Sequence, residues 1–428
     1  MRSQTISTKL QEIAKQAVDY PQMVFTTLAH HMDAEFLKEA YRQTRKSGSP
    51  GIDGVTAKEY EENLEENLKN LHERLKSGRY TAPPVGRTWI KKENGKLRPI
   101  GIPTFEDKIA QRAVVMLLEP IYEQIFHNFS HGFRKGRSQH YALRKLRENL
   151  ITHRTKWIVI ADITGLFDNL DHGKLRELIR KRVNDGRIIQ LIGKWLNAGV
   201  MEEGNIQYSE AGTPQGGVIS PLLSNIFLHY VLDDWYVKEV QPRMKGKSFL
   251  IRWADDFIIA FEDKTDAERA MKVLPERFKK YKLNLHPDKT NMIYFANPNS
   301  DKDNRKRGTF DFLGFTYYWG RGLNVNWAIK KRTARKREAR FMKRIYRYCK
   351  EHMHDSIKEQ YEAICLKLRG FYQYFGVRSN YAALEKVRKY TLKVWQKWLS
   401  RRSSKGKVLF DELRVNYPLP LPRIVHNV

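Results

Sequence analysis

The chain has 428 residues, which is long enough for two or three domains with a sizeable hydrophobic core. Its 78 lysines and arginines outnumber 48 aspartates and glutamates, a formal net charge of +30, for which a polyanion such as nucleic acid is the simplest partner. No apolar run reaches the roughly 18 residues that a membrane-spanning helix needs, and two cysteines are too few for a disulfide framework or a four-cysteine zinc site.

The N-terminal part is expected to be helical. The segment MRSQTISTKLQEIAKQ lacks the apolar core of a secretory signal, so we expect a cytoplasmic protein without a membrane partner. Two helices are predicted at 31–47 and 57–76, on either side of the turn-rich SGSPGIDG. From there to Trp319, short β-rich runs alternate with amphipathic helices, a pattern typical of an α+β protein.

A first carboxylate stands at the end of a predicted strand. The run KWIVIADI at 156–163 is β-rich and places Asp162 at the mouth of the strand, before TGLFDNLDH and a helix that starts near Lys174. Further along, FLIRWADDFIIAF at 249–261 predicts two strands joined by a tight turn at Ala-Asp-Asp. Taken alone, such a pair of aspartates is typical of an ordinary turn.

The two elements together indicate a metal site. If they are neighbours in one sheet, Asp162 and Asp255 project to the same place, with Asp256 beside them. Carboxylates about 4 Å apart repel by roughly 4 kcal/mol at an effective dielectric near 20, and divalent cations relieve that repulsion. Mg²⁺ prefers carboxylate oxygens, and two such ions about 4 Å apart can activate a 3′-hydroxyl and stabilise a pyrophosphate leaving group. The pattern therefore indicates nucleotidyl transfer.

The C-terminal part is expected to be helical from about 330 to 398. The run KKRTARKREARFMKR predicts a helix with an apolar stripe packed inward and a cationic surface facing out. The stripe consists of Met342, Ile345, Tyr348 and Cys349. The cationic surface is either simply solvated or bound to an anionic partner. Cys349 and Cys365 are both expected to be buried thiols.

With these residues in view, the sequence resembles the reverse transcriptase and maturase family encoded by group II introns, because eight blocks occur in the family's order. The blocks are SPGIDGVT at 49–56, GKLRPIGIPTFEDKIAQ at 95–111, SHGFRKGRS at 130–138, ADITGLFDNLDH at 161–172, GTPQGGVISPLLSNIFL at 212–228, WADD at 253–256, LNLHPDKT at 283–290 and FLGF at 312–315.

The resemblance implies a right-hand polymerase of the α+β class. Such a fold has fingers, a palm whose antiparallel sheet carries the aspartates with helices behind it, and an all-helical thumb. The implied divisions are an N-terminal helical extension at 1–47, fingers at 48–155, a palm at 156–319 with finger elements interleaved, and a helical thumb or maturase region with the C-terminal tail at 320–428.

The resemblance also implies the metal and nucleotide ligands. Asp162, Asp255 and Asp256 would be catalytic and hold two Mg²⁺ ions, for which Mn²⁺ is an alternative, with the backbone carbonyl of Ile163 as a further ligand. Lys92 and Arg98 match residues that hold the incoming triphosphate, a role that suits a point charge and a bidentate fork.

Further positions match residues around the nucleotide and the primer. Phe167 matches an aromatic gate that crowds the sugar 2′-carbon and selects deoxynucleotides; as a bare feature, a Phe after a strand is more often core. Gln215 matches a contact to nucleotide and template, with two glycines after it that would let the backbone approach the duplex. Lys289 matches a lysine near the triphosphate, while Leu313 and Gly314 match the turn that grips the primer end.

The segment after 320 matches the region that binds intron RNA in the family. The residues assigned to RNA are Lys330, Lys331, Arg332, Arg335, Lys336, Arg337, Arg340, Lys343 and Arg344. The aromatic residues Phe371, Tyr372, Tyr374 and Phe375 are expected in the core, with base stacking as the alternative. Trp253 stands where the family usually has Tyr, which keeps an aromatic wall and changes its polar tip. Longer members of the family carry a cysteine-bearing endonuclease after the thumb, and this sequence shows no counterpart of it. We therefore expect the endonuclease-lacking type.

The predicted function is RNA-directed DNA synthesis from dNTPs on an RNA template with a DNA primer, coupled to binding and splicing assistance of a group II intron RNA. Two alternatives remain open. One is an RNA-binding splicing factor with an idle polymerase centre, against which the intact aspartates and Phe167 count. The other is a domesticated reverse transcriptase in phage defence or repair, which the genomic context would distinguish.

Overall fold

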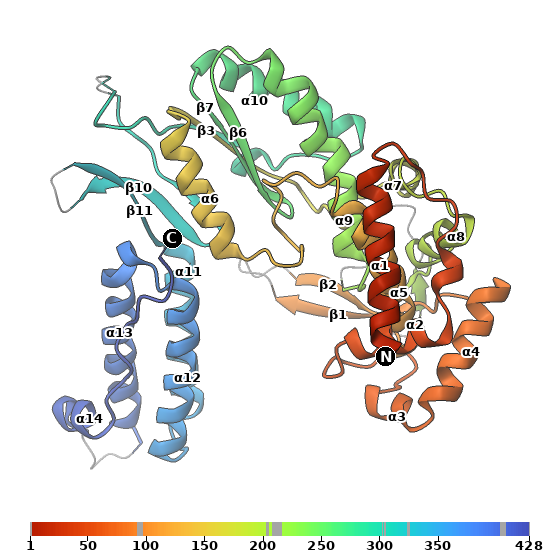
Figure 1. Ribbon diagram of the computed structural model, residues 1–428. Coiled ribbons are helices and arrows are strands. Elements are labelled where there is room, and N and C mark those ends of the chain that lie inside the picture. Colours follow the sequence, from red (N-terminus) through yellow and green to blue (C-terminus); the bar gives the residue numbers. More distant parts are fainter. Residues whose placement is uncertain are drawn as a thin grey trace.

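A computed structural model of the protein describes residues 2–91, 97–202, 205–207, 216–301, 303, 305–322, 326–402 and 408–427. Helices gather at the two ends of the chain, and a sheet stands between them with helices on both of its faces (Figure 1). The mixed helix and sheet class predicted from the sequence is confirmed. Among the described residues, no helix is long and apolar enough to cross a membrane.

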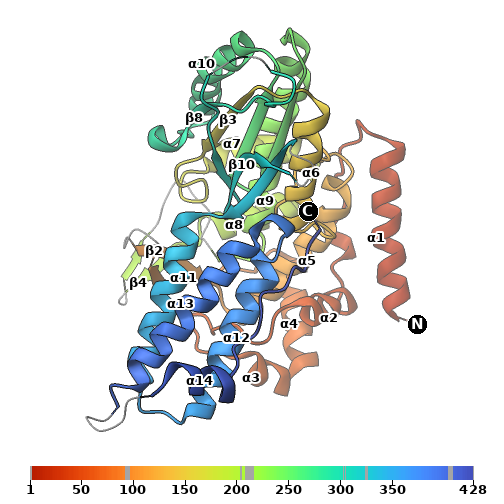
Figure 2. The same ribbon diagram turned by 90° about the vertical axis from the view of Figure 1, so that its left-hand side faces the viewer.

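The N-terminal part is helical, as expected. Its helices are α1 (Arg2–Asp19), α2 (Ala34–Gln43), α3 (Ala57–Glu62) and α4 (Leu64–Ser77). The predicted helix at 57–76 is split at Asn63 into α3 and α4. Thr56 and Glu59 form a capping box at the start of α3, and the left-handed Gly78 ends α4. Helix α1 stands at the edge of the molecule in Figure 2.

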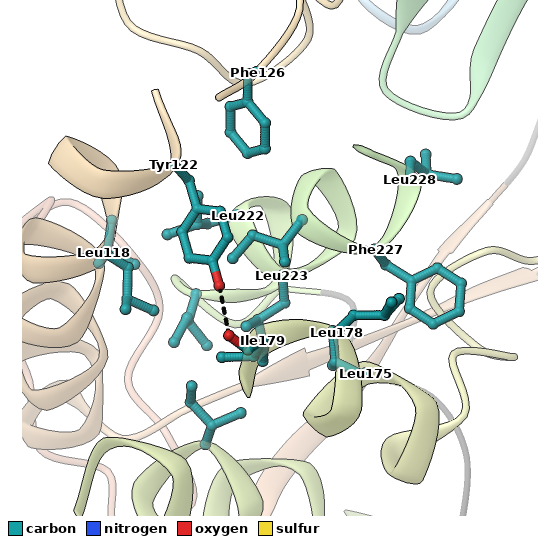
Figure 3. Close-up of a cluster of buried hydrophobic side chains, with 14 of the residues drawn as sticks. Leu118, Tyr122, Phe126, Leu175, Leu178, Ile179, Leu222, Leu223, Phe227 and Leu228 are labelled. Atoms are coloured by element: carbon teal, nitrogen blue, oxygen red, sulfur yellow. Dashed lines mark hydrogen bonds between the residues drawn. The ribbon is translucent and has the colours of Figure 1, made fainter. Parts of the chain in front are cut away.

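A large apolar core forms where α5 (Phe105–Tyr122), α7 (His172–Arg180), α8 (Gly186–Leu196) and α9 (Ser220–Leu228) meet. Helix α5 is apolar almost all round, which is the pattern of a helix buried on every side. Figure 3 shows side chains of α5, α7 and α9 packed together. The hydroxyl of Tyr122 donates to the carbonyl of Ile179 at 3.1 Å, which satisfies the buried polar group of this ring.

The central sheet has the strand order β6-β7-β3-β8, and all its neighbours are antiparallel. Its strands are β3 (Trp157–Asp162), β6 (Ser248–Trp253), β7 (Asp256–Phe261) and β8 (Asn291–Tyr294). Helix α10 (Lys264–Lys280) packs on one face and α6 (Gln139–Thr152) on the other. Because both faces are buried, the strands read as continuous apolar runs. The predicted strand at 156–163 and the hairpin at 249–261 are confirmed.

Two smaller sheets flank the central one. The first has the order β2-β1-β4-β5 and contains β1 (Val85–Lys91), β2 (Leu97–Ile102), β4 (Val200–Glu202) and β5 (Asn205–Gln207). The second has the order β11-β10-β9 and contains β9 (Phe310–Phe312), β10 (Phe315–Arg321) and β11 (Trp327–Thr333). The second sheet leads the chain from the central sheet into the C-terminal helices (Figure 1).

The C-terminal helices are α11 (Arg335–Glu351), α12 (Ile357–Phe375), α13 (Tyr381–Leu399) and α14 (Phe410–Asn416). The predicted stripe of α11 is confirmed, since Ile345 and Cys349 are buried and Met342 and Tyr348 are half-buried. The prediction of a helix from Lys330 is wrong, because that residue lies in strand β11.

The strand assignment follows a period of two rather than 3.6. Ile329, Lys331 and Thr333 are buried, while Arg332 between them is exposed. Two further expectations for the C-terminal part hold. Both cysteines are buried thiols, and Phe371, Tyr372 and Phe375 are buried with Tyr374 half-buried beside them.

Candidate active site

The backbone brings the three aspartates together at one end of the central sheet. Asp162 is the last residue of β3 and lies directly opposite Asp256, the first residue of β7. Opposed residues of antiparallel strands have Cβ atoms about 5 Å apart. Asp255 belongs to the turn that joins β6 to β7, which we call the aspartate turn (residues 253–256). The neighbourhood predicted for these three carboxylates is therefore confirmed.

The charges of the carboxylates act on one another. Desolvation of Asp256 by the surrounding protein, followed by the negative charges of Asp255 and Asp162, raises the pKa of Asp256 to about 7. The residue nevertheless remains accessible to solvent. Burial and the charge of Asp162 likewise raise the pKa of Asp255, while Arg98 and Lys289 counter the rise. These carboxylates repel one another when all of them are ionised, and a bound cation would relieve that repulsion.

The side chains do not yet converge as a ligand set. Among the described residues, no group of three or more His, Cys, Asp or Glu side chains is arranged to hold a metal ion. Metal binding by Asp162, Asp255 and Asp256 therefore stays a prediction, which their neighbourhood in the sheet supports. The ammonium group of Lys289 lies 2.5 Å from a carboxylate oxygen of Asp162 and neutralises part of the charge. The donor set of hard oxygens nevertheless fits Mg²⁺ or Mn²⁺ chemistry.

The carbonyl of Ile163 points toward the same place. Asp162 accepts a backbone hydrogen bond from His286 at 2.8 Å, and Thr164 donates to Asn284 at 2.8 Å. These two bonds flank Ile163 on the side of Leu285, with which it forms an isolated bridge. Since successive carbonyls of a strand alternate in direction, the carbonyl of Ile163 faces the aspartate turn.

A cavity of about 460 Å³, here called the aspartate cavity, opens at the turn. Its lining comes from four parts of the fold: the aspartate turn, the turn between β9 and β10, helices α11 and α12, and the segment of Phe133 and Gln139 at the start of α6. Asp255, Asp256 and Trp253 form one wall, and Leu313 and Gly314 form another. The predicted primer-grip turn therefore faces the aspartates.

The β9–β10 turn has an unusual backbone. Leu313 and Gly314 both have positive φ, 47° and 80°, a conformation typical of a tight hairpin turn. The hydroxyl of Tyr374 donates to the carbonyl of Leu313 at 2.8 Å, and Ala334 donates to the carbonyl of Gly314 at 2.9 Å. These contacts hold the turn at the mouth of the cavity.

The structure describes only some of the residues predicted to contact the nucleotide. Arg98 is exposed on β2, and its positive charge acts on Asp255, so it faces the site. Phe167 is half-buried in the turn that follows β3. Lys92 and Gln215 lie outside the described residues. Gly216 lies against β2, since a Cβ there would be 2.5 Å from the carbonyl oxygen of Gly101. The approach of its backbone to a duplex stays a prediction.

The residues predicted to bind RNA divide into separate groups. Arg337, Arg340 and Arg344 line the aspartate cavity together with Phe341 of the same helix. Other exposed cations lie elsewhere on α11, and these are Arg335, Lys336 and Lys343. Lys330 and Arg332 lie on β11.

Lys331 is the one residue of this set whose predicted role is contradicted. It is 2% exposed, so its ammonium group cannot reach an RNA phosphate. Burial and the nearby charge of Arg147 lower its pKa to about 7.

Sequence reasoning missed a buried polar group beneath the turn. Arg252 of β6 is fully buried and ion-paired with Asp233. The sequence did contain an indication of this residue, because an arginine inside the apolar run FLIRW is unusual for a strand buried on both faces. Its partners could not be found in this way, since they come from distant segments.

Comparison with known proteins decides the family. A sequence profile described as reverse transcriptase (RNA-dependent DNA polymerase) matches residues 90–317, more than half of the 428 residues. The chain belongs to the reverse transcriptase family. The match includes the three aspartates and the β9–β10 turn. Members of the reverse transcriptase family use divalent metal ions, in accord with the oxygen donors found here.

Individual relatives agree with this membership. The protein is 41% identical to protein YkfC of Escherichia coli over 225 residues, and 38% identical to the group II intron-encoded protein LtrA of Lactococcus lactis over 241 residues. An uncharacterised 91 kDa protein in the cob intron of Schizosaccharomyces pombe is 32% identical over 254 residues. The alignments cover 51%, 56% and 59% of this reverse transcriptase chain, but only 58%, 40% and 31% of the respective relatives.

Proposed function

We propose that the protein is an RNA-directed DNA polymerase of the group II intron type, which copies an RNA template from a DNA primer with dNTPs and also assists splicing as a maturase. The observation that carries the proposal is the register of β3 against β7, which sets Asp162 opposite Asp256 beside a cavity. Family membership and the relative LtrA, described as encoded by a group II intron, support it.

The fold is assigned to the parts of a right-hand polymerase. The central sheet with its helices is the palm, over 156–319, and the sheet of β1 and β2 belongs to the fingers, over 48–155. The C-terminal helices with the segment from 320 form the thumb, and residues 1–47 form a helical extension. The side of the cavity formed by α11 and α12 supports the assignment of a thumb that closes on a duplex.

The aspartates hold the metal ions in this proposal. Asp162, Asp255, Asp256 and the carbonyl of Ile163 would supply the oxygen donors, and Lys289 would give up its ion pair with Asp162 to bound cations. Two Mg²⁺ ions, or Mn²⁺ in their stead, would activate the primer 3′-hydroxyl and stabilise the charge of the leaving pyrophosphate. The protein's own part is to hold these carboxylates at the sheet end and to hold the primer terminus against Leu313 and Gly314.

Other residues orient the nucleotide. Arg98 faces the carboxylates and offers a planar fork to a triphosphate, with Lys92 and Gln215 as further contacts. Lys289, released from Asp162, supplies a second cation. Phe167 follows β3 and sets its ring against the sugar 2′-carbon, so that ribonucleotides are rejected.

Two nucleic acids share the thumb in this proposal. The arginines that line the cavity, Arg337, Arg340 and Arg344, hold the template–primer duplex through its phosphates. The exposed cations of α11 that do not line the cavity, Lys336 and Lys343 among them, bind the intron RNA.

Primer extension tests the polymerase. Wild-type protein should extend a DNA primer on an RNA template with dNTPs and Mg²⁺, and the paired substitution Asp255→Asn with Asp256→Asn should reduce the rate by at least about 10⁴-fold, since metal and charge stabilisation supply most of such a rate. RNA binding should persist, because these side chains lie apart from the outward cations. Equal extension by the variant would remove the aspartates from the mechanism. Splicing assistance that survives in the variant would separate the two roles.

A further inference from the structure

Arg252 is the most completely bonded buried cation of the central sheet. Its guanidinium makes a two-pronged ion pair with Asp233, at 2.8 Å from Nε and 2.6 Å from Nη2. Nη2 also donates to the hydroxyl of Ser130 at 2.7 Å, and Nη1 to the side-chain oxygen of Asn225 at 3.0 Å. Arg252 and Asp233 are both fully buried.

One remaining bond of Arg252 reaches the aspartate turn itself. Nη1 donates to the carbonyl of Ala254 at 3.0 Å. Ala254 has a φ of 54°, the left-handed region that a residue with a Cβ adopts at a cost. A strained residue directly before Asp255 persists only where its surroundings hold it.

The segment at 129–132 also packs against the aspartate turn. Gly132 lies so near that a Cβ there would be 2.4 Å from the backbone nitrogen of Ala254. The carbonyl of Gly132 accepts a bond from the side chain of Asn225 at 2.8 Å. The backbone of Arg252 pairs with the same segment, since it donates to Phe129 and accepts from His131, both at 2.9 Å.

Two other stretches of chain, the loop after α5 and helix α9 with the π-helical turn that continues it, thus meet at one guanidinium. Residues 129–132 come from the loop after α5, Asn225 from α9, and Asp233 from the π-helical turn after it. A buried ion pair is a poor source of stability, because desolvation of both charges offsets their attraction. Its presence under a strained turn calls for another role.

We propose that Arg252, fixed by Asp233, is a positioning residue that holds the carbonyl of Ala254 and thereby sets Asp255 and Asp256 for metal binding. The inference rests on the proposed polymerase function. Lysine cannot replace the arginine, since only the planar fork, with its five N–H donors, can serve five acceptor atoms on four residues.

The test replaces the pair rather than one partner. Arg252→Met together with Asp233→Leu removes both charges, so no unpaired charge stays buried. The control is Arg182→Met, which removes another buried arginine, one that donates to the carbonyl of Met23 at 2.8 Å far from the turn. We expect the pair variant to lose about 100-fold in kcat, the effect of a misplacement near 1 Å, with KM for dNTP and template–primer affinity unchanged.

A second readout does not depend on activity. Mn²⁺ bound to the protein, measured by electron paramagnetic resonance titration, should weaken about tenfold in the pair variant, as is typical when support behind metal ligands is lost. The control variant should bind Mn²⁺ like the wild type, although its melting temperature falls. If wild-type protein fails to extend primers, the proposed function fails, and the Mn²⁺ titration still decides on Arg252.

Two single substitutions cover the case in which the pair variant does not fold. Ser130→Ala and Asn225→Ala each remove one bond to Arg252 and keep the ion pair, so smaller losses of kcat and Mn²⁺ affinity in the same direction are expected. Wild-type kcat and Mn²⁺ binding in a folded pair variant, or in both single variants, would overturn the proposal. So would equal losses in the Arg182 control.

Discussion

Lys331 is a cation in a place where charge is unfavourable. It lies on β11 with its side chain 2% exposed, and its ammonium group has no hydrogen-bond partner among the described residues. The ring of Tyr317 lies 5.6 Å away, and Arg147 adds a like charge nearby. Burial, and then Arg147, lower the pKa of Lys331 to about 7.

The lowered pKa predicts how stability varies with pH. Between pH 7 and the ordinary lysine value, the folded protein binds fewer protons at this site than the unfolded chain, so folding stability rises with pH. From pH 7 to pH 9 the site should add about 2 kcal/mol to the free energy of unfolding. Lys331→Met should stabilise the protein at pH 7 and remove this part of the rise, as measured by urea unfolding at three pH values. The exposed Lys336→Met should leave the rise in place, and an unchanged slope in Lys331→Met would contradict the assignment.

At this scale the sequence predicted some residues better than others. Asp162, Asp255 and Asp256 could be found because each ends or begins an apolar strand, and strand ends are readable from local pattern. Arg252 gave only a local anomaly, since Ser130, Asn225 and Asp233 reach it through tertiary packing. Lys331 was misassigned to RNA binding because the many lysines and arginines around it hid the alternation of buried and exposed positions in β11.

At the scale of elements, α11 carries cations in two separate rows. Arg337, Arg340 and Arg344 follow one another at intervals of three and four residues and line the aspartate cavity. Lys336, Lys343 and Lys350, all exposed, follow at intervals of seven and so share a different row. The helix itself was predicted, whereas the division of its charge needed the structure.

The two rows predict separable defects. Alanine at the three cavity arginines should weaken binding of template–primer and lower extension at least tenfold. Alanine at Lys336, Lys343 and Lys350 should leave extension near the wild-type level and weaken binding of structured intron RNA. Each variant loses three positive charges, so each serves as the control for the other. Anisotropy titrations and extension assays would contradict the division if both variants lost both activities alike.

The whole molecule carries a net charge of +30, far more positive charge than the few cations around the aspartates supply. Polyanion binding of this kind releases counterions, so the logarithm of the affinity falls linearly with the logarithm of salt, with a slope of about −0.7 to −0.9 for each phosphate contact. We expect a slope of about −4 or steeper for RNA between 50 and 300 mM KCl, measured by fluorescence anisotropy. A flat response would contradict the assignment of the basic surface to nucleic acid.

The general class of the molecule followed from alternating strand and helix patterns, and the arrangement of its sheets did not. The basic segment at 327–333 joins a third sheet, which turns the chain from the central sheet into α11. Strands β9, β10 and β11 follow one another and pair with their neighbours in sequence, but the lysines and arginines of β11 hid its period of two. The pairing of β3 with β7 and β8 joins distant segments, and it depends on packing that no local window contains.

The central sheet has one more consequence, for the lengths of its strands. Ile258 and Ile251 point into one apolar core, while Ile259 and Leu250 point into the other. Inserting or deleting a single residue in β6 or β7 would exchange the two sets and leave both cores misfilled. Relatives that differ from this chain in loop size should therefore keep the number of residues in this hairpin fixed.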